Sequence, residues 1–478
     1  MKFTKFGKAL SLGALSVGVV FGVTSCIESY ATGYLYVTGT VTAATGSNGI
    51  ITGYSVDHNT GLLTSIHGLP VPSGGANPVR AVLTNGSRFM YVLNRGANAA
   101  GSPDCYGTGA NACLNSNITE FVVGGNGVLT EEEQFNSAGT NPFRIMVDTT
   151  GSYILVLDHD APDNLSPSSG DNCALALGSL VSTESVPYTC GDITVFQVEA
   201  TTGRLSKVVN AQVTAANGSP LTYFPIPANP VDFVLSGGTI LTLGAPYSAA
   251  PASYPYTGGT EVGPYSYSST TGQLTLSQTS VQPLTAGTAT GGSAPMKQGN
   301  AIVNAGGIIF VLDNEPIVTT STDGIPGYQA QSQILPYNVG ASGALQAVVS
   351  GIIPDDTTLA NPIYLIEETK DKYIYVANQG NNVTGNNAES GIAAYTVESQ
   401  SPFQLEFTSD EPFGSGAGPQ CIVEDPSNQF IYEANQIDST VTGRALDPDT
   451  GELRDMRVTS TYTLQGPPTW CLMDGRTN

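Results

Sequence analysis

Charged side chains are scarce in this chain, and basic ones are the scarcest. Only 12% of the 478 residues are charged, and 16 Lys and Arg stand against 39 Asp and Glu, which leaves a formal net charge of −23 at pH 7. This excess of negative charge repels nucleic acid and phosphorylated metabolites, so we expect no nucleic-acid partner. Disordered acidic chains also lack apolar residues, whereas 40% of this chain is apolar, which is enough to build a core.

Recognisable catalytic strings are also missing. The chain has only three His, one Trp and no GxSxG, P-loop, dinucleotide or CxxC string. These absences give no support to a nucleophile-elbow hydrolase, a nucleotide site or structural zinc. Glycine (56), proline (30) and tyrosine (22) are plentiful instead, a composition typical of a turn-rich all-β chain.

The N-terminal segment has the pattern of an export signal. Three lysines (Lys2, Lys5, Lys8) precede an apolar stretch over residues 9–23, which is short for a spanning helix and ends in Val-Thr-Ser-Cys at Cys26. This ending resembles the bacterial lipobox. The resemblance implies a signal peptide over 1–25, a lipidated Cys26 and a tether over 26–33, without an inner-membrane retention signal. The alternative is an ordinary secretory signal with an incidental cysteine.

Cysteine usage agrees with export. Six cysteines remain after Cys26, an even number in an exported chain. Two local disulfides are expected. Cys105 and Cys113 lie eight residues apart, and Cys173 and Cys190 bracket one polar segment. The last pair, Cys421 and Cys471, either bridges neighbouring strands or stays as buried thiols.

One unit recurs seven times along the chain. A strand-like run rich in Tyr and Val appears at residues 34–40, 89–94, 153–158, 239–244, 308–313, 373–378 and 430–435. A tight turn, most often Gly-x-Leu, follows at 60–63, 126–129, 202–205, 271–274, 342–345 and 450–453, with Ser-Pro-Phe-Gln-Leu in the sixth copy. A proline then opens another strand: Pro78, Pro142, Pro230, Pro295, Pro362, Pro419 and Pro468. Repetition at this period is typical of solenoids and propellers.

The repeat predicts an all-β, seven-bladed β-propeller of four-stranded antiparallel blades over residues 34–478. A single meander cannot bury both of its faces, so seven packed around an axis form the stable arrangement. The chain starts with a second strand and ends with a first strand, so the C-terminal strand should complete the N-terminal blade. The alternative is an irregular β-sandwich. We expect a monomer.

Meander topology separates two faces of the ring. The plain face carries the strand 1–2 and 3–4 turns, whereas the elaborated face carries the 2–3 and 4–1 connections. Long insertions at 95–117, 158–191, 244–261 and 313–333 all fall between strands 2 and 3. We therefore expect a site on the elaborated face, at the mouth of the central channel.

With these repeats, the chain resembles the lactonase family of seven-bladed propellers, which includes 6-phosphogluconolactonases and muconate-cyclising enzymes. The resemblance runs from about residue 33 to 474, and its best local matches are residues 416–441 and the closing Pro-Pro-Thr-Trp-Cys at 467–471. It implies a site at the channel mouth, where enzymes of the family carry a histidine, two arginines and a glutamate.

This chain retains one of those four groups. The histidine is replaced by Val231, and one arginine by Met296 and Lys297. The glutamate of an Asn-Glu pair is matched by Asn314-Glu315, while the second arginine is replaced within Ala377-Asn378-Gln379-Gly380. An Asn-Arg-Gly string places Arg95 on a different blade. Lactone hydrolysis needs a base and cations, so the resemblance leaves Glu315 and Lys297 as catalytic candidates and Arg95, Asn314, Asn378 and Gln379 as ligand-binding candidates.

An acidic string, Leu-Asp-His-Asp-Ala-Pro-Asp-Asn at 157–164, opens the longest insertion. Asp158, Asp160 and Asp163 offer oxygen ligands at calcium-like spacing, and His159 is a further ligand-binding candidate. The string lacks the glycine and distal glutamate of an EF-hand loop, so we interpret it as a solvated acidic loop, with a calcium site as the alternative.

Together these patterns predict an exported, lipid-anchored propeller in the periplasm, at the outer membrane or on the cell surface. Its elaborated face would bind a protein, a glycan or a small molecule, and no cofactor is required, although calcium is allowed. The competing hypothesis is a divergent lactonase, with Glu315 as acid/base and Lys297 or Arg95 as the cation.

Overall fold

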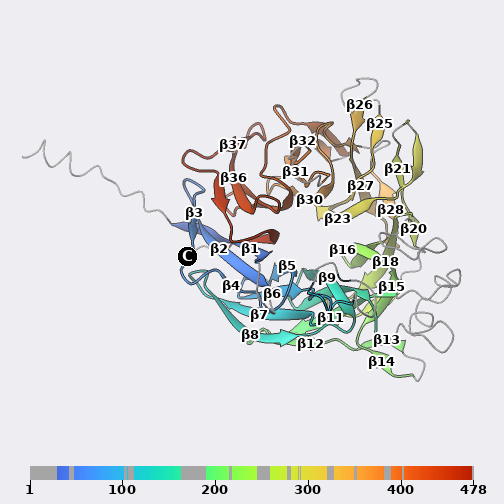
Figure 1. Cartoon of the computed structure of the whole chain (residues 1–478). Coiled ribbons are helices and arrows are strands. Elements are labelled where there is room, and N and C mark those ends of the chain that lie inside the picture. Colours follow the sequence, from blue (N-terminus) through green and yellow to red (C-terminus); the bar gives the residue numbers. More distant parts are fainter. Residues whose placement is uncertain are drawn as a thin grey trace, which may run out of the picture.

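The computed structural model describes residues 30–475 apart from 42–47, 85, 102–104, 106–111, 163–189, 215–217, 245–258, 277–280, 289, 291, 320–327, 349–352, 382–388 and 401–402. Figure 1 views the molecule along the axis of a ring of antiparallel sheets. No helix in the described part of the chain has the length and hydropathy needed to cross a membrane.

Seven sheets form the blades, and each is a four-stranded meander. The strands of each blade are given from the axis outward. Blade 1 consists of β39 (Pro468–Asp474), β1 (Ala31–Thr40), β2 (Gly49–Asp57) and β3 (Leu63–Ser65), and blade 2 of β5 (Pro78–Leu83), β6 (Phe89–Asn94), β7 (Asn117–Val123) and β8 (Leu129–Phe135). Blade 3 consists of β9 (Thr140–Val147), β10 (Tyr153–Asp160), β11 (Cys190–Val198) and β12 (Leu205–Lys207), and blade 4 of β16 (Pro230–Ser236), β17 (Thr239–Gly244), β18 (Glu261–Tyr267) and β19 (Leu274–Leu276).

The remaining three blades repeat this order. They are β23 (Gly299–Ala305), β24 (Ile308–Asp313), β27 (Gln333–Val339) and β28 (Leu345–Ala347); β30 (Pro362–Glu367), β31 (Tyr373–Asn378), β32 (Gly391–Gln400) and β33 (Phe403–Phe407); and β34 (Pro419–Glu424), β35 (Phe430–Asn435), β36 (Thr440–Leu446) and β37 (Leu453–Asp455). The predicted seven-bladed propeller is therefore confirmed.

The outermost strand is split in five blades, and a second short piece pairs with the third strand. These pieces are β4 (Val71–Pro72), β15 (Phe224–Ala228), β20 (Gln282–Pro283), β29 (Ile353–Pro354) and β38 (Thr461–Thr463). Three small hairpins project between blade strands: β13 (Asn210–Thr214) with β14 (Pro220–Leu221), β21 (Thr285–Gly287) with β22 (Ser293–Pro295), and β25 (Ile317–Thr319) with β26 (Tyr328–Ala330). The β21–β22 hairpin thus elaborates a 4–1 connection and β25–β26 a 2–3 connection, while β13–β14 lies between the two pieces of a split outermost strand.

Blade 1 closes the ring as the repeat frame predicts. The C-terminal β39 pairs antiparallel with β1, and Val37 lies opposite Cys471. A disulfide joins Cys471 to Cys421 of the neighbouring inner strand β34, with 5.8 Å between their Cα atoms. The open alternative for these two cysteines is thereby resolved in favour of the bridge.

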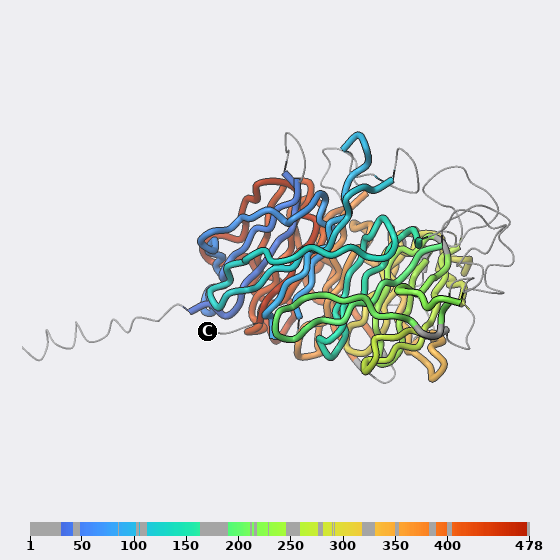
Figure 2. Tube along the Cα trace, turned by 90° about the horizontal axis from the view of Figure 1, so that it is seen from below, coloured from blue at the N-terminus to red at the C-terminus, as the bar shows by residue number. Residues whose placement is uncertain are grey.

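The other cysteines follow the same trend. Cys105 and Cys113 form the predicted local disulfide in the β6–β7 connection, which stands above the ring in the side view of Figure 2. Cys190 is disulfide-bonded, and its expected partner Cys173 lies outside the described residues, as does Cys26.

Adjacent blades are joined through the two repeat elements that the sequence shows. At four junctions, the tyrosine of a Tyr-x-Tyr or Phe-x-Tyr run donates its hydroxyl hydrogen to the carbonyl of the turn glycine in the next blade. The pairs are Tyr36 with Gly127 (2.8 Å), Tyr91 with Gly203, Tyr375 with Gly451 (2.8 Å) and Tyr432 with Gly61 (2.6 Å). The glycines have φ of +68° to +84°, and the ring of the first aromatic residue leaves no room for a Cβ on them.

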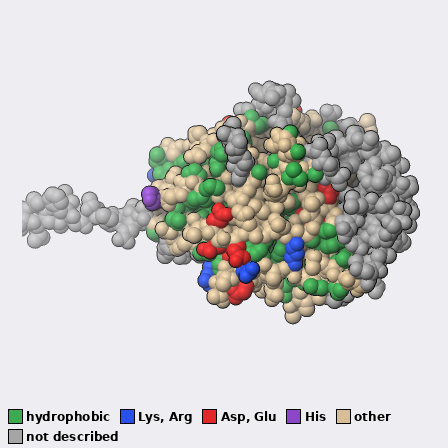
Figure 3. Space-filling model, turned by 60° about the horizontal axis from the view of Figure 1, so that its bottom comes forward, with side chains coloured by type: hydrophobic (Ala, Val, Ile, Leu, Met, Phe, Trp, Pro, Cys, Tyr) green, Lys and Arg blue, Asp and Glu red, His purple; other side chains and the backbone are tan. Residues whose placement is uncertain are grey.

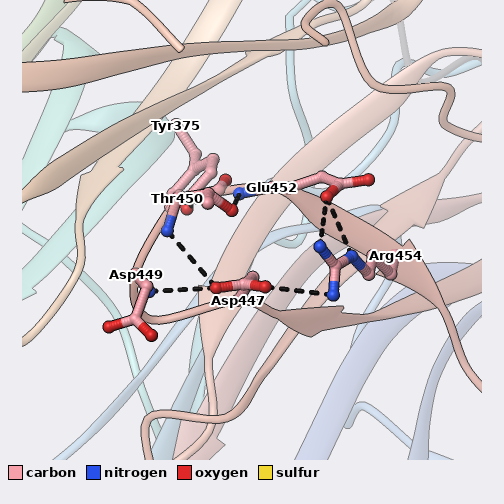
Figure 4. Close-up of polar contacts among 7 residues, drawn as sticks. Tyr375, Asp447, Asp449, Thr450, Glu452 and Arg454 are labelled. Carbon is pink, nitrogen blue, oxygen red and sulfur yellow. Dashed lines mark hydrogen bonds and ion pairs between the residues drawn. The ribbon is translucent and has the colours of Figure 1, made fainter. Parts of the chain in front are cut away.

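Figure 4 shows the polar contacts of this turn in the seventh blade, beside Tyr375. The Asp447 carboxylate accepts hydrogen bonds from the backbone N–H of Asp449 (3.0 Å) and Thr450 (3.3 Å), and it pairs with Arg454 at 3.0 Å. The backbone hydrogen bond from Asp449 is the main reason that the pKa of Asp447 is lowered. The turn is thereby held in the shape that presents the Gly451 carbonyl to Tyr375.

Two expectations about strand starts are wrong. Pro295 does not open a first strand: it ends β22, and the inner strand β23 begins at Gly299. Pro295 belongs to the hairpin β21–β22 instead. The residue at the channel mouth in this blade, at the start of the inner strand, is therefore Asn300 rather than Met296 or Lys297. In blade 1, β1 begins at Ala31, within the segment that we assigned to the tether.

Candidate functional site

The channel mouth is built by a recurring turn at the start of each inner strand. In four blades an asparagine with φ of +52° to +59° precedes the strand proline: Asn77, Asn141, Asn229 and Asn361. Asparagine tolerates this left-handed conformation better than most residues. A register shift follows two residues later in the blades that start at Pro78, Pro230 and Pro362, and it is the mark of a β-bulge.

The same turn also positions the residue that directly follows the second strand of the blade. The backbone N–H of Arg95 donates to the Asn77 carbonyl, and that of Gln379 donates to the Asn361 carbonyl, both at 3.0 Å. Asn314 bonds in the same way to the residue before Gly299, at 3.0 Å. Three predicted ligand-binding residues therefore occupy equivalent positions around the mouth.

Six side-chain amides from three consecutive blades meet at this mouth, and we call them the carboxamide row. They are Asn300, Asn314, Asn361, Gln379, Gln420 and Gln436, and all six are partly exposed. Asn361 lies at the centre: it accepts a hydrogen bond from the Asn300 side chain at 2.6 Å, and its backbone N–H donates to Asn314 at 2.9 Å. At the mouth, amide hydrogen bonds thus link blade 5 to blade 6.

The row continues into the seventh blade. The Asn361 amide donates to Gln379 at 2.8 Å, and Gln379 donates to Gln436 at 3.3 Å. Gln420 also donates to Gln436, at 3.1 Å. Each carboxamide has two donor hydrogens and one acceptor oxygen, so the row has spare capacity for a ligand and carries no charge.

Glu315 lies beside this row but has no cation as a partner. One carboxylate oxygen accepts a hydrogen bond from the backbone N–H of Lys297 at 3.0 Å, while no ion pair between the two side chains occurs among the described residues. Lys297 itself is exposed. The catalytic roles of Glu315 and Lys297 stay predictions.

Arg95 is held three blades away from Glu315. Its guanidinium donates to Asn141 at 2.7 Å and to the backbone carbonyl of Cys105 at 2.8 Å, inside the disulfide-bearing connection. Arg95 is therefore a fixed cation at the far side of the mouth. Asn378 is different again, because it is fully buried within its blade and donates weakly to the Val376 carbonyl at 3.4 Å.

The described part of the acidic string in the third blade, residues 157–162, is not a solvated loop. Asp158 and Asp160 belong to strand β10 and are buried, and the His159 ring lies 3.5 Å from Asp160 and packs near Phe143. Strand β10 continues to pair with Asp192 of β11, which explains why these polar residues extend the strand.

Burial also decides the charge of this acidic cluster. The Thr194 hydroxyl lies between the carboxylates, 3.4 Å from Asp158 and 3.1 Å from Asp192. Desolvation raises the pKa of Asp158 to about 8 and that of Asp192 well above its ordinary value. Over the described residues, no group of three or more His, Cys, Asp and Glu is placed to hold a metal ion, and Asp163 lies outside them.

A charged layer crosses the channel at the second residue after the strand proline in five inner strands, and we call it the channel layer. It consists of Arg80, Arg144, Asp232, Tyr364 and Trp470. Arg144 donates to Asp232 at 3.1 Å, and Arg80 lies 3.7 Å from the same carboxylate oxygen. The Arg80 guanidinium stacks 4.1 Å from the Trp470 ring.

Sequence reasoning missed the channel layer. It considered the residue directly after each strand proline, whereas the layer is formed by the next one, as in Asn-Pro-Val-Arg and Asn-Pro-Phe-Arg. Comparing the third strand positions of all seven repeats would have shown two arginines and an aspartate where the other copies have aromatic or small residues.

Comparison with known proteins agrees with this architecture. Residues 357–470 match the family described as Lactonase, 7-bladed beta-propeller. The resemblance to the lactonase family is confirmed. The matched segment covers blades 6 and 7 and reaches the first residues of the closing strand. No curated protein sequence matches the chain.

Solved structures of lactonase-like propellers cover nearly the whole chain. A candidate 6-phosphogluconolactonase from Bacteroides fragilis superposes with a TM-score of 0.58 at 12% identity, covering 92% of this chain and 98% of its own. A similarly described protein from Bacteroides uniformis superposes with a TM-score of 0.58 at 12% identity, covering 92% of this chain and 99% of its own. The periplasmic gluconolactonase PpgL of Pseudomonas aeruginosa gives 0.52 at 16% identity, with 92% and 99% covered. At these identities the likeness establishes the fold alone.

Proposed function

We propose that this lactonase-like propeller is an exported, lipid-anchored binding module that captures a neutral, hydroxyl-rich ligand, such as a glycan, at its elaborated face. The observation that carries the proposal is the carboxamide row. Amide side chains both donate and accept hydrogen bonds without charge, which suits the hydroxyl groups of a sugar. The row is shared by three blades, so the fold holds its groups in fixed positions.

The electrostatics of the mouth argue against efficient hydrolysis of a lactone. An oxyanion needs preorganised donors or cations next to the reacting carbonyl, together with a base that activates water. Glu315 is occupied by the Lys297 backbone, and Arg95 is anchored three blades away on Asn141. The two groups do not converge on one carbonyl-sized position.

Export is supported by the cysteines. Two disulfides stand among the described residues, Cys105–Cys113 and Cys421–Cys471, and such bonds persist mainly in oxidising compartments. The N-terminal pattern that ends at Cys26 adds the lipid anchor. A similar fold is found in a protein named as a periplasmic gluconolactonase.

The alternative is a divergent lactonase. It is favoured by the family match and by the place of Glu315, which is partly exposed at the mouth next to the carboxamide row. In that case Glu315 would act as acid/base, with Lys297 or Arg95 approaching only when substrate binds.

Two assays on the soluble form, residues 27–478, separate these functions. Binding to an array of neutral glycans should be lost in Asn361→Ala and retained in the plain-face control Asn126→Ala. Hydrolysis of uncharged and phosphorylated lactones, with and without calcium, should be undetectable. Turnover that disappears in Glu315→Gln would overturn the binding proposal and establish the lactonase, whereas glycan binding that survives Asn361→Ala would reject the carboxamide row as the site.

A further inference from the structure

The central channel contains a cavity on the side opposite the carboxamide row. Its volume is about 470 Å³, which lies within the usual range of small-molecule pockets. The lining comes from the second halves of the inner strands and reaches Val147 and Glu424, the last residues of β9 and β34. Because these strand ends lead into the 1–2 turns, the cavity opens toward the plain face.

Apolar side chains form the wall of this cavity. They include Val82, Met146, Val234, Val303, Ile366 and Val423, contributed by six different inner strands. Much of the described surface in Figure 3 is uncharged. The wall residues line the cavity and also pack against the apolar cores of the blades. A wall of this kind removes the aliphatic part of a ligand from water.

One cation lies at the inner end of the cavity. Arg80 is mostly buried, with 14% of its side chain exposed, and its guanidinium lies flat on Trp470 at 4.1 Å. No hydrogen bond from this guanidinium to another described residue is present, because its nearest carboxylate oxygen, on Asp232, is 3.7 Å away. Arg80 lines the cavity, so its N–H donors can reach an acceptor bound there.

The charge of the channel layer is unbalanced. Arg144 takes the shorter contact to Asp232, at 3.1 Å, so one carboxylate serves two guanidinium groups. Burial lowers the pKa of Arg80 to about 10, which shows how poorly its charge is solvated. An anion at this position would supply both the missing charge and the missing hydrogen-bond acceptors.

The rim does not oppose an anion. Glu424 lines the cavity, but its carboxylate accepts hydrogen bonds from the backbone N–H and hydroxyl of Thr369, at 2.9 and 2.8 Å, and from Asn428 at 3.1 Å. Burial raises its pKa. From this rim to Arg80 the inner strands advance by three residues, which corresponds to a depth of about 10 Å.

We propose that the plain-face cavity binds an anionic amphiphile, with its carboxylate on the Arg80 guanidinium and its aliphatic chain along the apolar wall. This site is separate from the carboxamide row, and it does not depend on the function proposed for that row. The Trp470 indole would flank the carboxylate, because it covers one face of the guanidinium that the carboxylate pairs with.

The single tryptophan of the chain makes the test direct. The soluble form is titrated with decanoate below its micellar concentration while Trp470 fluorescence is followed, and calorimetry gives the stoichiometry. Decanol and decylamine provide neutral and cationic ligands of the same length. Arg80→Gln removes the cation, whereas Val423→Phe fills the cavity and leaves Arg80 in place. Arg204→Gln, at an exposed position, serves as the control.

We expect saturable one-to-one binding of decanoate, at least tenfold weaker binding of decanol, and none of decylamine. Arg80→Gln and Val423→Phe should each weaken decanoate binding at least tenfold, and Arg204→Gln should not change it. Circular dichroism checks that each variant is folded. If Arg80→Gln does not fold, the decanoate affinity of Val423→Phe tests the proposal instead. Equal binding of decanoate and decanol, unchanged affinity in Val423→Phe, or no saturable change in the parent protein would overturn the proposal.

Discussion

The Tyr432 hydroxyl donates a 2.6 Å hydrogen bond to the Gly61 carbonyl, across 371 positions of the chain. This bond joins the seventh blade to the first and repeats the bond that Tyr375 makes to Gly451 between blades 6 and 7. The junction that closes the ring, between blades 7 and 1, is therefore made by the same contact as the internal junction between blades 6 and 7. The stabilities of the two junctions can be compared directly.

Removing this hydroxyl should destabilise the protein. Tyr432→Phe leaves a buried carbonyl without its donor, for which we expect a loss of about 1–2 kcal/mol in the free energy of unfolding. Urea denaturation of Tyr432→Phe and of the matched Tyr375→Phe measures the effect. Equal losses are expected, and a negligible loss in both variants would show that these bonds do not hold the blades together.

The disulfide between the inner strands should matter more. Cys421 and Cys471 are 50 residues apart, and closing a loop of that length corresponds to about 4 kcal/mol in the chain-entropy treatment. We expect a Cys421→Ala/Cys471→Ala double variant to unfold at markedly lower denaturant. The matched control removes Cys105 and Cys113, a local bridge eight residues apart, and should cost less, about 2.5 kcal/mol in the same treatment.

Stability should increase when the pH falls from 8 to 5. Burial raises the pKa of Glu433 to about 8, with Arg444 opposing this shift and Asp438 adding to it, and it raises the pKa of Glu120 and Asp313 to about 7. The folded protein therefore holds protons that the unfolded chain has released above its ordinary carboxyl pKa near 4.5. The stabilisation is complete below that pH and is lost as the pH rises toward 8.

Thermal denaturation between pH 5 and 8 measures this dependence. Glu433→Gln should reduce the slope, because an amide does not titrate, while the remaining buried carboxyls preserve part of it. A melting temperature that is constant or rises over this range would contradict the raised pKa values. General repulsion between surface acids is the same in both proteins, so their difference isolates Glu433.

The channel layer provides a further prediction. Asp232→Asn would leave Arg80 and Arg144 facing each other without a counter-charge, and breaking a buried ion pair in this way costs about 3–5 kcal/mol. The control is Glu452→Gln, which removes one of the two carboxylate partners of the exposed Arg454 and should change stability by less than about 1 kcal/mol. Urea denaturation of both variants tests the contrast, and similar small losses would show that the layer is well solvated.

The sequence was sufficient for the fold because the repeat itself carries the structure. The tyrosine and the turn glycine recur at fixed positions, so blade number, closure by β39 and the order of strands follow from spacing. Contacts between blades are less accessible. Nothing in the linear sequence shows that Asn300 meets Asn361, since amides in loops are common and the two residues are 61 positions apart.

Errors arose where a local pattern had two structural interpretations. Asp158 and Asp160 have the composition of a loop, but both pair with β9 and Asp158 also pairs with β11, which makes them buried strand residues. Pro295 matches the other strand-opening prolines, yet a hairpin shifts the strand to Gly299. In both cases tertiary pairing overrides a local signal.

Closure of blade 1 by the two chain ends also sets the orientation of the molecule. In this meander a second strand begins, and a first strand ends, at the plain face, so Ala31 and Asp474 both lie there, as the side view of Figure 2 allows the reader to follow. A lipid on Cys26 would be separated from Ala31 by five residues, a reach of roughly 17 Å. Such an anchor would turn the cavity containing Arg80 toward the bilayer and the carboxamide row toward the surroundings, so one molecule would take amphiphiles from the membrane side and polar ligands from the other.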